Sequence, residues 1–393
     1  MSLSGKRILL GVSGGIAVYK IPELLSRLRK AGAETKVVMT EGATRFVTPL
    51  TFQTMSAHPV YTDLFAENEG MIAHIDLTRD ADLFLIAPAT ANILAKMACG
   101  IADDLLSATA LAAHCPVMVA PAMNVVMYHN VATQKNIETL RERGIQVLQP
   151  DAGWLACQED GEGRMPEAVS LFLSIESALS EKDLRGKQIL VSAGPTRERL
   201  DPVRFLTNDS SGKQGVAIAK RAMMRGAEVT LVHGEMKVPV PQGVRAIAVE
   251  STEDMLLALE KEFPKADALF MAAAPADFRP VEQKTQKIKG LDDGQIRTLD
   301  MVDTPDILQH LAQKKTHQTV IGFATESEKV LTHAREKREK KKLDYIVAND
   351  VTKEGAAFDY DTNIVTILGE EMEEALPLLS KEEVADRLLD LLQ

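Results

Sequence analysis

Cysteine is scarce in this sequence, and long apolar runs are missing from it. Three cysteines occur among 393 residues, with neither paired nor zinc-like spacing. We therefore expect a reducing compartment, the cytoplasm, and no disulfide framework. Nothing approaches the roughly 20 consecutive apolar residues of a membrane span, because the apolar run near the amino terminus breaks into glycines. These absences predict a cytoplasmic protein that does not enter membranes.

An excess of positive charge is also lacking. The formal net charge of −11 at pH 7 argues against general binding to nucleic acids or anionic membranes, but it leaves room for a local basic pocket. A hydrophobic content of 45% and a charged content of 26% are typical of a globular protein. The length exceeds what one ordinary core fills and predicts two or three domains.

Short, continuously apolar segments alternate with amphipathic segments along the chain. Apolar strands that are each followed by a helix indicate a parallel sheet covered on both faces. A charged amphipathic helix around residues 174–187 separates two such series, which we take as domains 1–182 and 186–393. The expected fold class is α/β, with two tandem doubly wound, Rossmann-like domains and mainly parallel sheets. In the first domain, the segments expected to hold strands are 6–12, 33–40, 81–89, 115–124 and 144–150. In the second domain they are 187–198, 212–234 (a helix followed by a strand), 244–250, 266–278, 318–326, 343–350 and 363–369. The last of these is expected as a closing antiparallel edge.

A turn of small residues, "GVSGGIAVYK" at 11–20, follows the first expected strand. Its backbone N–H groups suit a phosphate, and Ser13 adds a hydroxyl donor. The spacing is not that of the dinucleotide-binding fingerprint, and a tight turn without a ligand also needs glycine. We favour a phosphate site, because the turn lies at the carboxyl end of a parallel strand.

Further polar residues follow later strands of the first domain. Thr90, Asn92 and Ser107 lie in loops or helix starts, where N-capping is the competing interpretation. Asn124 leaves the sheet at the edge where ligands bind in open α/β sheets. His74, taken alone, reads as an ordinary surface or capping histidine.

Residues 154–165, "WLACQEDGEGRM", hold the only tryptophan and Cys157 in a glycine- and acid-rich run without helical or strand period. Such a run predicts a loop with a mobile tip. Free cysteine is usually buried and inert, so its place here needs a reason.

The second domain has its own polar turns. Residues 206–215, "LTNDSSGKQG", lack the spacing of a P-loop but still suit a nucleotide phosphate or an acyl phosphate. Asp277 ends an expected strand and suits a ribose hydroxyl or an exocyclic amine, or else caps a turn. Lys337 and Lys341 share a helix face and together suit a triphosphate, although most lysines of that segment belong to a solvated face.

These motifs together resemble one family. The motifs "GVSGGIAVYK", "APATAN", "PAMN" and "ACQEDGEGRM", followed by "AGPTRERLDPVRFLTNDSSGK", "AAAPADFRP" and "KIKG", occur in this order along the chain. They resemble the bifunctional phosphopantothenoylcysteine decarboxylase/phosphopantothenate–cysteine ligases of coenzyme A biosynthesis, which join a flavin-containing cysteine decarboxylase to a CTP-dependent ligase.

For the first domain, the resemblance implies an FMN-dependent decarboxylase. Ser13 and Gly14 match contacts of the FMN phosphate, and His74 matches an active-site histidine. The remaining matches are Thr40, Thr90, Asn92 and Ser107 around the flavin, Asn124 at the substrate carboxylate, Cys157 as the proton donor of a substrate loop, and Arg164 and Met165 beside the substrate. Gln158 departs from the family's usual glycine after the cysteine, which puts the path of the loop in question.

The implied chemistry explains the cysteine. Hydride transfer to FMN from the carbon bearing sulfur lets CO2 leave a stabilised enethiolate, and return of the hydride with a proton makes the cycle redox-neutral. The flavin supplies the difficult step, and the protein supplies orientation and proton transfer. A cysteine on a loop can close over the intermediate, donate the proton and open again.

For the second domain, the resemblance implies that CTP converts 4′-phosphopantothenate to an acyl-cytidylate, from which the amine of cysteine displaces CMP. Asn208 matches the residue that handles the acyl-cytidylate, and Ala272 and Ala273 match backbone contacts under the nucleotide. Mg²⁺ is expected on the triphosphate, and no acidic cluster stands out as a metal site formed by protein groups alone. The other matches to CTP contacts are Asp277, Lys287, Pro305, Asp306, Ile307, Leu308, Phe323, Lys337 and Lys341.

The resemblance further implies a homo-oligomer, a dodecamer in which trimers of the first domain are joined by dimers of the second. Its FMN sites would lie across subunit interfaces. Two other functions stay open: an FMN oxidoreductase or flavin prenyltransferase-like enzyme with an unrelated nucleotide-binding tail, and a non-catalytic flavin-binding regulatory subunit. Neither requires Cys157 together with the ligase lysines.

Overall fold

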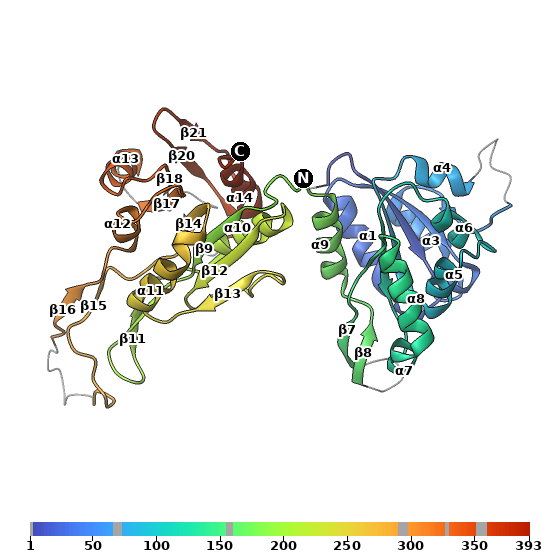
Figure 1. The fold of residues 1–393 in the computed structure, drawn as a ribbon, viewed down its shortest axis with the longest axis horizontal. Helices are drawn as coiled ribbons and strands as arrows, with labels where there is room; N and C mark the ends of the chain where they lie inside the picture. The colour runs from blue at the N-terminus through green and yellow to red at the C-terminus, as the bar shows by residue number, and fades with distance from the viewer. Residues whose placement is uncertain (1–2, 66–72, 155–159, 290–297, 327–329, 351–359) are drawn as a thin grey trace. The chain divides into compact units, whose positions relative to one another are not determined.

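The computed structural model describes residues 3–65, 73–154, 160–289, 298–326, 330–350 and 360–393. Contacts divide the chain into two compact units, Met1–Ser180 and Glu181–Gln393, which are described separately (Figure 1). Within the described ranges, none of the helices combines the length and apolarity that a membrane crossing requires.

Six parallel strands form the sheet of the first unit, in the order β3-β2-β1-β4-β5-β6. The chain moves outward from β1 in one direction and then crosses to β4 on its other side. The carboxyl ends of β1 and β4 therefore form a switch point, where open α/β sheets bind ligands. The strands are β1 (Arg7–Val12), β2 (Glu34–Met39), β3 (Val60–Tyr61), β4 (Leu83–Ala89), β5 (Val117–Pro121) and β6 (Gln146–Val147).

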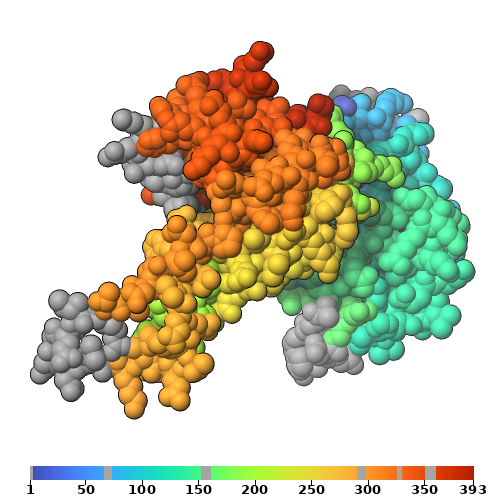
Figure 2. Space-filling view, turned by 60° about the vertical axis from the view of Figure 1, so that its left-hand side comes forward, coloured from blue at the N-terminus to red at the C-terminus, as the bar shows by residue number. Residues whose placement is uncertain are grey.

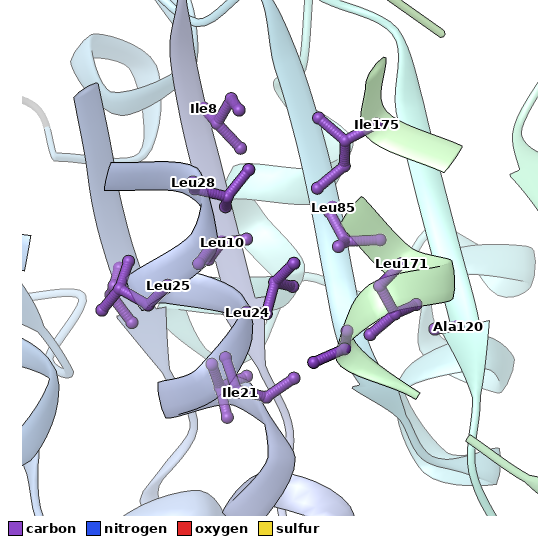
Figure 3. Close-up of a cluster of buried hydrophobic side chains, with 14 of the residues drawn as sticks. Ile8, Leu10, Ile21, Leu24, Leu25, Leu28, Leu85, Ala120, Leu171 and Ile175 are labelled. Atoms are coloured by element: carbon purple, nitrogen blue, oxygen red, sulfur yellow. The ribbon is translucent and has the colours of Figure 1, made fainter. Parts of the chain in front are cut away.

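Helices cover both faces of this sheet. On one face α1 (Ile21–Lys30) and α9 (Ala168–Leu179) pack beside each other, and their fully buried Leu24 and Leu171 belong to the same core cluster as Leu85 of β4 (Figure 3). Apolar residues of α1 recur at helical spacing, so one stripe of the helix is buried. The other face carries α4 (Ala73–Arg79), α5 (Ala91–Cys99), α6 (Leu105–Leu111) and α8 (Val131–Glu142). The remaining helices are η1 (Ile16–Lys20), α2 (Glu41–Thr44), α3 (Pro49–Ser56) and α7 (Val125–His129).

The second unit contains an eight-stranded sheet, in the order β13-β12-β9-β14-β17-β18-β20-β21. Its first six strands are parallel, and β20 and β21 are antiparallel to their neighbours. The α/β class with mainly parallel sheets is thus confirmed for both units. The strands are β9 (Gln188–Ala193), β12 (Glu228–His233), β13 (Arg245–Ala248), β14 (Ala268–Met271), β17 (Thr319–Glu326), β18 (Tyr345–Asp350), β20 (Val365–Leu368) and β21 (Glu373–Ala375).

Two helix layers enclose this sheet as well. Helices α10 (Lys213–Met224) and α14 (Lys381–Asp390) cover one face, and α11 (Thr252–Glu262), α12 (Ile307–Ala312) and α13 (Val330–Lys340) cover the other. The short η2 (Phe263–Lys265) follows α11.

In the described part of the chain, four two-stranded ribbons stand outside the two sheets. They are β7 (Asp151–Trp154) with β8 (Asp160–Arg164), β10 (Arg197–Arg199) with β11 (Phe205–Thr207), β15 (Phe278–Pro280) with β16 (Met301–Asp303), and β19 (Thr362–Asn363) with β22 (Leu379–Ser380). Strands β15 and β16 form an arm that projects from the second unit, in yellow and orange at the lower left of Figure 2. Sequence periodicity misses such ribbons, because each strand is too short to show alternation.

Four expectations need correction. Residues 154–165 do not form a simple loop, since their described parts belong to the β7–β8 hairpin. The helix expected around 174–187 is α9, which ends earlier because Ser180 has extended backbone angles. The strand expected at 266–278 ends at Met271, and Asp277 lies beyond it. The segment 363–369 is antiparallel as expected, but β21 lies outside it at the edge.

Candidate active sites

The first unit contains a cavity of about 940 Å³ at the carboxyl ends of β1, β2, β4 and β5, called here the first cavity. This is the position that the switch-point argument indicates. Its volume lies within the range of small-molecule sites. Of the residues predicted for FMN and substrate, it is lined by Ser13, Gly14, Thr40, Thr90, Asn92, Asn124, Arg164 and Met165.

The turn after β1 is closely packed. A Cβ atom on Gly14 would lie 2.8 Å from the backbone carbon of Gly42, so only glycine fits there without a shift. The buried Ser13 hydroxyl donates a hydrogen bond to the Pro88 carbonyl oxygen at 2.8 Å. The same hydroxyl accepts a hydrogen bond from the Thr90 N–H at 3.1 Å. These contacts fix the turn after β1 against the start of α5.

Three predicted binding residues are helix N-caps. Thr40 accepts the Ala43 N–H, and Thr90 accepts the Ile93 N–H. Asn124 Oδ1 accepts two N–H groups at the start of α7. The capping interpretation is therefore confirmed for Thr90. It does not remove these residues from the cavity, because all three also line it.

The base of the β7–β8 hairpin is fastened to the turn after β1. Lys20, which is only 6% exposed, donates to the Met165 carbonyl and to Glu167 Oε1, both at 2.9 Å. Arg164 pairs with the same carboxylate at 2.5 Å. The hydrogen bond from Lys20 holds the pKa of Glu167 below its ordinary value, although partial burial opposes this. Lys20, the last residue of η1, thus connects this helix to the segment that follows β8, and Arg164 holds the same carboxylate from the hairpin side.

A second charged cluster borders the same cavity. Lys96 pairs with Asp103 at 2.6 Å and with Asp104 at 2.7 Å, and both Lys96 and Asp104 line the cavity. Burial alone would lower the pKa of Lys96, but the hydrogen bonds to the two carboxylates outweigh it and raise that pKa. Neither Lys20 nor Lys96 was singled out from the sequence. Lys20 closes the glycine-rich motif, which was the available signal.

Two residues predicted for the first site do not line the cavity within this chain. Ser107 forms a capping box with Asp104 at the start of α6 and is 2% exposed. His74 lies in the first turn of α4, a helix that packs against α6. Cys157 lies outside the described residues, as does Gln158.

The second unit contains a cavity of about 740 Å³, called here the second cavity, at the carboxyl ends of β14, β17 and β18. Lysine side chains and carboxylates both line it. It brings together nearly all residues predicted for the ligase: Asn208, Ala272, Ala273, Asp277, Pro305, Asp306, Ile307, Leu308, Phe323, Lys337 and Lys341.

The segment after β14, residues 272–277, forms one wall of the second cavity. Asn208 donates from Nδ2 to the carbonyl oxygens of Ala274 and Pro275, at 3.2 and 2.9 Å. The Ala273 N–H donates to the Ser192 hydroxyl. The wall is therefore held by residues far from it in sequence, and Asn208 is part of that support.

Two lysines, one on α13 and one just after it, also line the second cavity. Lys341 pairs with Asp306 at 2.9 Å, and Lys337 donates to the Phe323 carbonyl oxygen at 3.2 Å. Burial would raise the pKa of Asp306, but hydrogen bonds from the Gln309 N–H and from Lys341 outweigh it and lower that pKa. The expectation that Lys337 and Lys341 lie together is confirmed.

Sequence reasoning missed a second basic group at this cavity. Lys213 begins α10 and pairs with Asp361 at 2.7 Å, and the buried Lys381 donates to the Tyr360 carbonyl oxygen. Both line the second cavity. Lys213 belongs to "NDSSGK", but nothing in the sequence brings Lys381 to the same place, because the two lie 168 positions apart.

Lys287 is not among the residues that line the second cavity of its own chain. It is exposed on the arm, next to Ile288, whose N–H donates to the buried Asp201 carboxylate at 3.0 Å. Among the described residues, no group of three or more His, Cys, Asp or Glu side chains is arranged to hold a metal ion.

Two family models divide the chain between them. The family "Flavoprotein" matches residues 1–180, and the family "DNA/pantothenate metabolism flavoprotein C-terminal domain" matches residues 184–393. The first unit is thus a member of a flavoprotein family.

Full-length relatives match both halves together. The coenzyme A biosynthesis bifunctional protein CoaBC of Vibrio vulnificus (strain YJ016) is 46% identical, with 100% of this chain and 98% of the relative covered. CoaBC of Bacillus subtilis (strain 168) is also 46% identical, with 98% and 96% covered. The solved structure of the FMN-dependent cysteine decarboxylase SpaF is 37% identical over 44% of this chain and 99% of its own, with a TM-score of 0.40. The chain therefore belongs to the CoaBC family of bifunctional coenzyme A biosynthesis enzymes, in which a phosphopantothenoylcysteine decarboxylase flavoprotein domain precedes a phosphopantothenate–cysteine ligase domain.

Proposed function

We propose that the second cavity binds CTP and joins cysteine to 4′-phosphopantothenate, and that the first cavity holds FMN and decarboxylates the resulting 4′-phosphopantothenoylcysteine. The observation that carries the proposal is the gathering of the predicted residues around two separate cavities, each at the carboxyl edge of a parallel sheet. The proposed domains are 1–182 and 186–393, and the cytoplasm is the proposed compartment.

The lining of the first cavity fits FMN. Ser13, Gly14 and Gly15 line it in the turn after β1, and their backbone N–H groups and the Ser13 hydroxyl suit a phosphate. Thr40, Thr90 and Asn92 supply polar groups around an otherwise mainly apolar space, which suits a ribityl chain and an aromatic ring. When bound there, FMN accepts and returns a hydride, and the chain's own residues bind, orient and protonate the substrate.

Substrate would enter between Asn124 and the hairpin base. Because Asn124 uses Oδ1 as a helix cap, its Nδ2 is the group suited to donate to a substrate carboxylate. Arg164 and Met165 stand at the base of the β7–β8 hairpin. Cys157 lies between these two strands in the sequence, and we assign it the return of a proton to the substrate carbon. Closure of such a hairpin excludes water during that step.

The second cavity fits a nucleoside triphosphate. Ala272 and Ala273 leave a wall without long side chains, Asp277 offers an acceptor for ribose or amine groups, and lysines supply positive charge for phosphates. Phe323 and residues 305–308 complete the same lining. Mg²⁺ would arrive on the triphosphate, since it keeps phosphate and water ligands in preference to a protein cage.

Asn208 is assigned the handling of the acyl-cytidylate. Its amide already donates to two carbonyl oxygens of the wall, which fixes its side chain beside residues 272–277. From that position its side-chain oxygen, which accepts, can bind the amine of cysteine as that amine displaces CMP.

A homo-oligomer is part of the proposal. Ile16, Tyr19 and Met127 line the first cavity, and their exposed fractions are 56%, 61% and 49%. Large apolar side chains exposed together mark a surface that another molecule covers. His74 and Lys287 do not line the cavities of their own chain. We therefore propose that neighbouring copies complete both sites, in a dodecamer built from trimers of the first domain and dimers of the second.

A spectrum and a product analysis test the proposal. The purified protein should be yellow with the absorption bands of oxidised flavin, and with CTP, Mg²⁺, 4′-phosphopantothenate and cysteine it should release CMP. An FMN oxidoreductase with an unrelated tail would be yellow but would release no CMP. A flavin-binding regulatory subunit would release neither CMP nor CO2.

A further inference from the structure

A series of buried, hydrogen-bonded side chains supports the wall of the second cavity, residues 272–277. The Ala276 N–H donates to the Thr196 hydroxyl at 2.9 Å, and that hydroxyl lies 2.9 Å from the hydroxyl of Thr252. Thr252 in turn donates both its hydroxyl and its N–H to Glu198 Oε1, each at 2.8 Å. Thr196, Thr252 and Glu198 are 0%, 1% and 4% exposed.

The direction of these hydrogen bonds is fixed by the acceptor at their end. Glu198 Oε1 receives the Thr252 N–H and therefore acts as an acceptor toward the Thr252 hydroxyl as well. The oxygen of Thr252 is then left to accept from Thr196, and the oxygen of Thr196 is left to accept from Ala276. Each hydroxyl thus donates toward Glu198 and accepts from the other side, and the Ala276 N–H is directed at the buried Thr196.

Glu198 lies at the start of a helix. Thr252 is the first residue of α11, whose N-cap is Ser251. The first N–H groups of a helix lack partners within the helix, and the positive end of the helix dipole favours a negative group there. The buried carboxylate is therefore held by the helix start, and it orders the two threonines.

The carbonyl side of Ala276 is also held by a hydrogen bond. Thr304 donates its hydroxyl to the Ala276 carbonyl oxygen at 2.5 Å and its N–H to the Asp277 carbonyl oxygen at 3.0 Å. Ala276 is thus bonded on both sides. Asp277, the next residue, is exposed at the wall of the second cavity.

We propose that Thr196, Thr252 and Glu198 are positioning residues for nucleotide binding, and that they act through Ala276 on Asp277. This rests on the proposed function of the second cavity as the CTP site. None of the three lines that cavity, so their effect is carried by the backbone of residues 276–277. Loss of the hydrogen bonds among these three side chains should weaken binding of the nucleotide more than it slows the reaction of bound nucleotide.

Thr196→Val tests this in the full-length protein. Valine keeps the shape but removes the acceptor for the Ala276 N–H, so we expect the KM for CTP in CMP release to rise by about tenfold with kcat within about threefold. Thr196→Ser keeps the hydroxyl and should restore the KM to within about twofold of the wild type. Glu198→Gln retains an acceptor oxygen and should also stay close to the wild type.

Thr109→Val is the matched control. Thr109 is a fully buried threonine of the first unit whose hydroxyl donates to the Leu105 carbonyl oxygen of its own helix, so its loss should leave the KM for CTP unchanged. If Thr196→Val does not fold, Thr252→Val replaces it, because that change removes the acceptor on which the Thr196 hydroxyl depends. Decarboxylation of supplied 4′-phosphopantothenoylcysteine by each variant checks that the first unit is intact.

Three results would overturn the inference: an unchanged KM for CTP in Thr196→Val, an equal rise in Thr196→Ser, or a loss confined to kcat. A wild-type protein that releases no CMP at all would instead refute the proposed function of the second cavity. The two failures are therefore distinguishable.

Discussion

At the scale of single residues, the same side chain often stabilises a helix start and borders a cavity. Thr40, Thr90 and Asn124 all do both. Helix capping uses only an acceptor oxygen of such a side chain, so the donor groups of the same side chain can serve another purpose. Substitutions that keep the acceptor can therefore separate folding from binding.

Asn124→Asp makes this separation. Aspartate caps a helix as well as asparagine does, so the free energy of unfolding should change by less than about 0.5 kcal/mol. The donor to the substrate carboxylate is lost and a like charge replaces it, which should lower kcat/KM for decarboxylation by roughly a hundredfold. Thermal unfolding and CO2 release measure the two effects.

Asn130→Asp is the control for that variant. Asn130 caps α8 by accepting the Ala132 N–H at 2.9 Å, and it does not line the first cavity. Decarboxylation should stay within about twofold of the wild type. Equal losses in both variants would remove the substrate role of Asn124.

At the scale of elements, the hairpin base depends on the charges that hold it. Glu167 is 48% exposed and Lys20 is 6% exposed, so the pair lies at the border of solvent and core. A pair of this kind contributes about 1 kcal/mol or less after solvent screening. Its main effect is to fix Met165 and Arg164 beside the first cavity.

Glu167→Gln should show the contribution of this ion pair as a pH-dependent difference in the free energy of unfolding. The Lys20 hydrogen bond depresses the pKa of Glu167, so the stabilisation is fully present above the ordinary glutamate pKa of about 4.3 and is lost as pH falls through the depressed value. The stability difference between wild type and variant should be constant from pH 5 to 8 and shrink below about pH 4. Calorimetry of the first unit's transition measures it.

The exposed pair of Glu23 and Arg27, four residues apart on α1, provides the comparison. Glu23→Gln should cost no more than about 0.5 kcal/mol at neutral pH. A difference for Glu167→Gln that grows as pH falls would contradict the assigned direction.

Elements differ in how well the sequence predicts them. Continuously apolar strands such as β1, β4 and β9 were predicted, because burial on both faces leaves a clear pattern. The hairpin β7–β8 was missed, since Gly161 and Gly163 carry no side chains that could alternate. Clusters such as Lys213 with Lys381 were also missed, because tertiary contacts alone bring these residues together.

At the scale of the whole molecule, each unit has its own cores. The buried clusters of the first unit draw only on residues up to Ile175, and those of the second begin at Leu184. Each cavity is likewise lined by residues of one unit. Among the described residues, each unit thus supplies its own buried clusters and its own cavity.

Separation of the chain between Ser180 and Glu181 should leave the ligase reaction intact. The fragment 181–393 should be colourless and should release CMP at a rate within about twofold of the full-length protein. The fragment 1–180 should retain flavin. A folded, dimeric fragment 181–393 without CMP release would show that the second unit needs the first.

The most direct test of the whole account follows one carboxyl carbon through both reactions. Cysteine labelled with ¹³C in its carboxyl group is incubated with the full-length protein, 4′-phosphopantothenate, CTP and Mg²⁺, and labelled CO2 is measured by mass spectrometry. Labelled CO2 should appear together with CMP and only when CTP and 4′-phosphopantothenate are both present. Labelled CO2 without CTP, or CMP release that never leads to labelled CO2, would contradict the account.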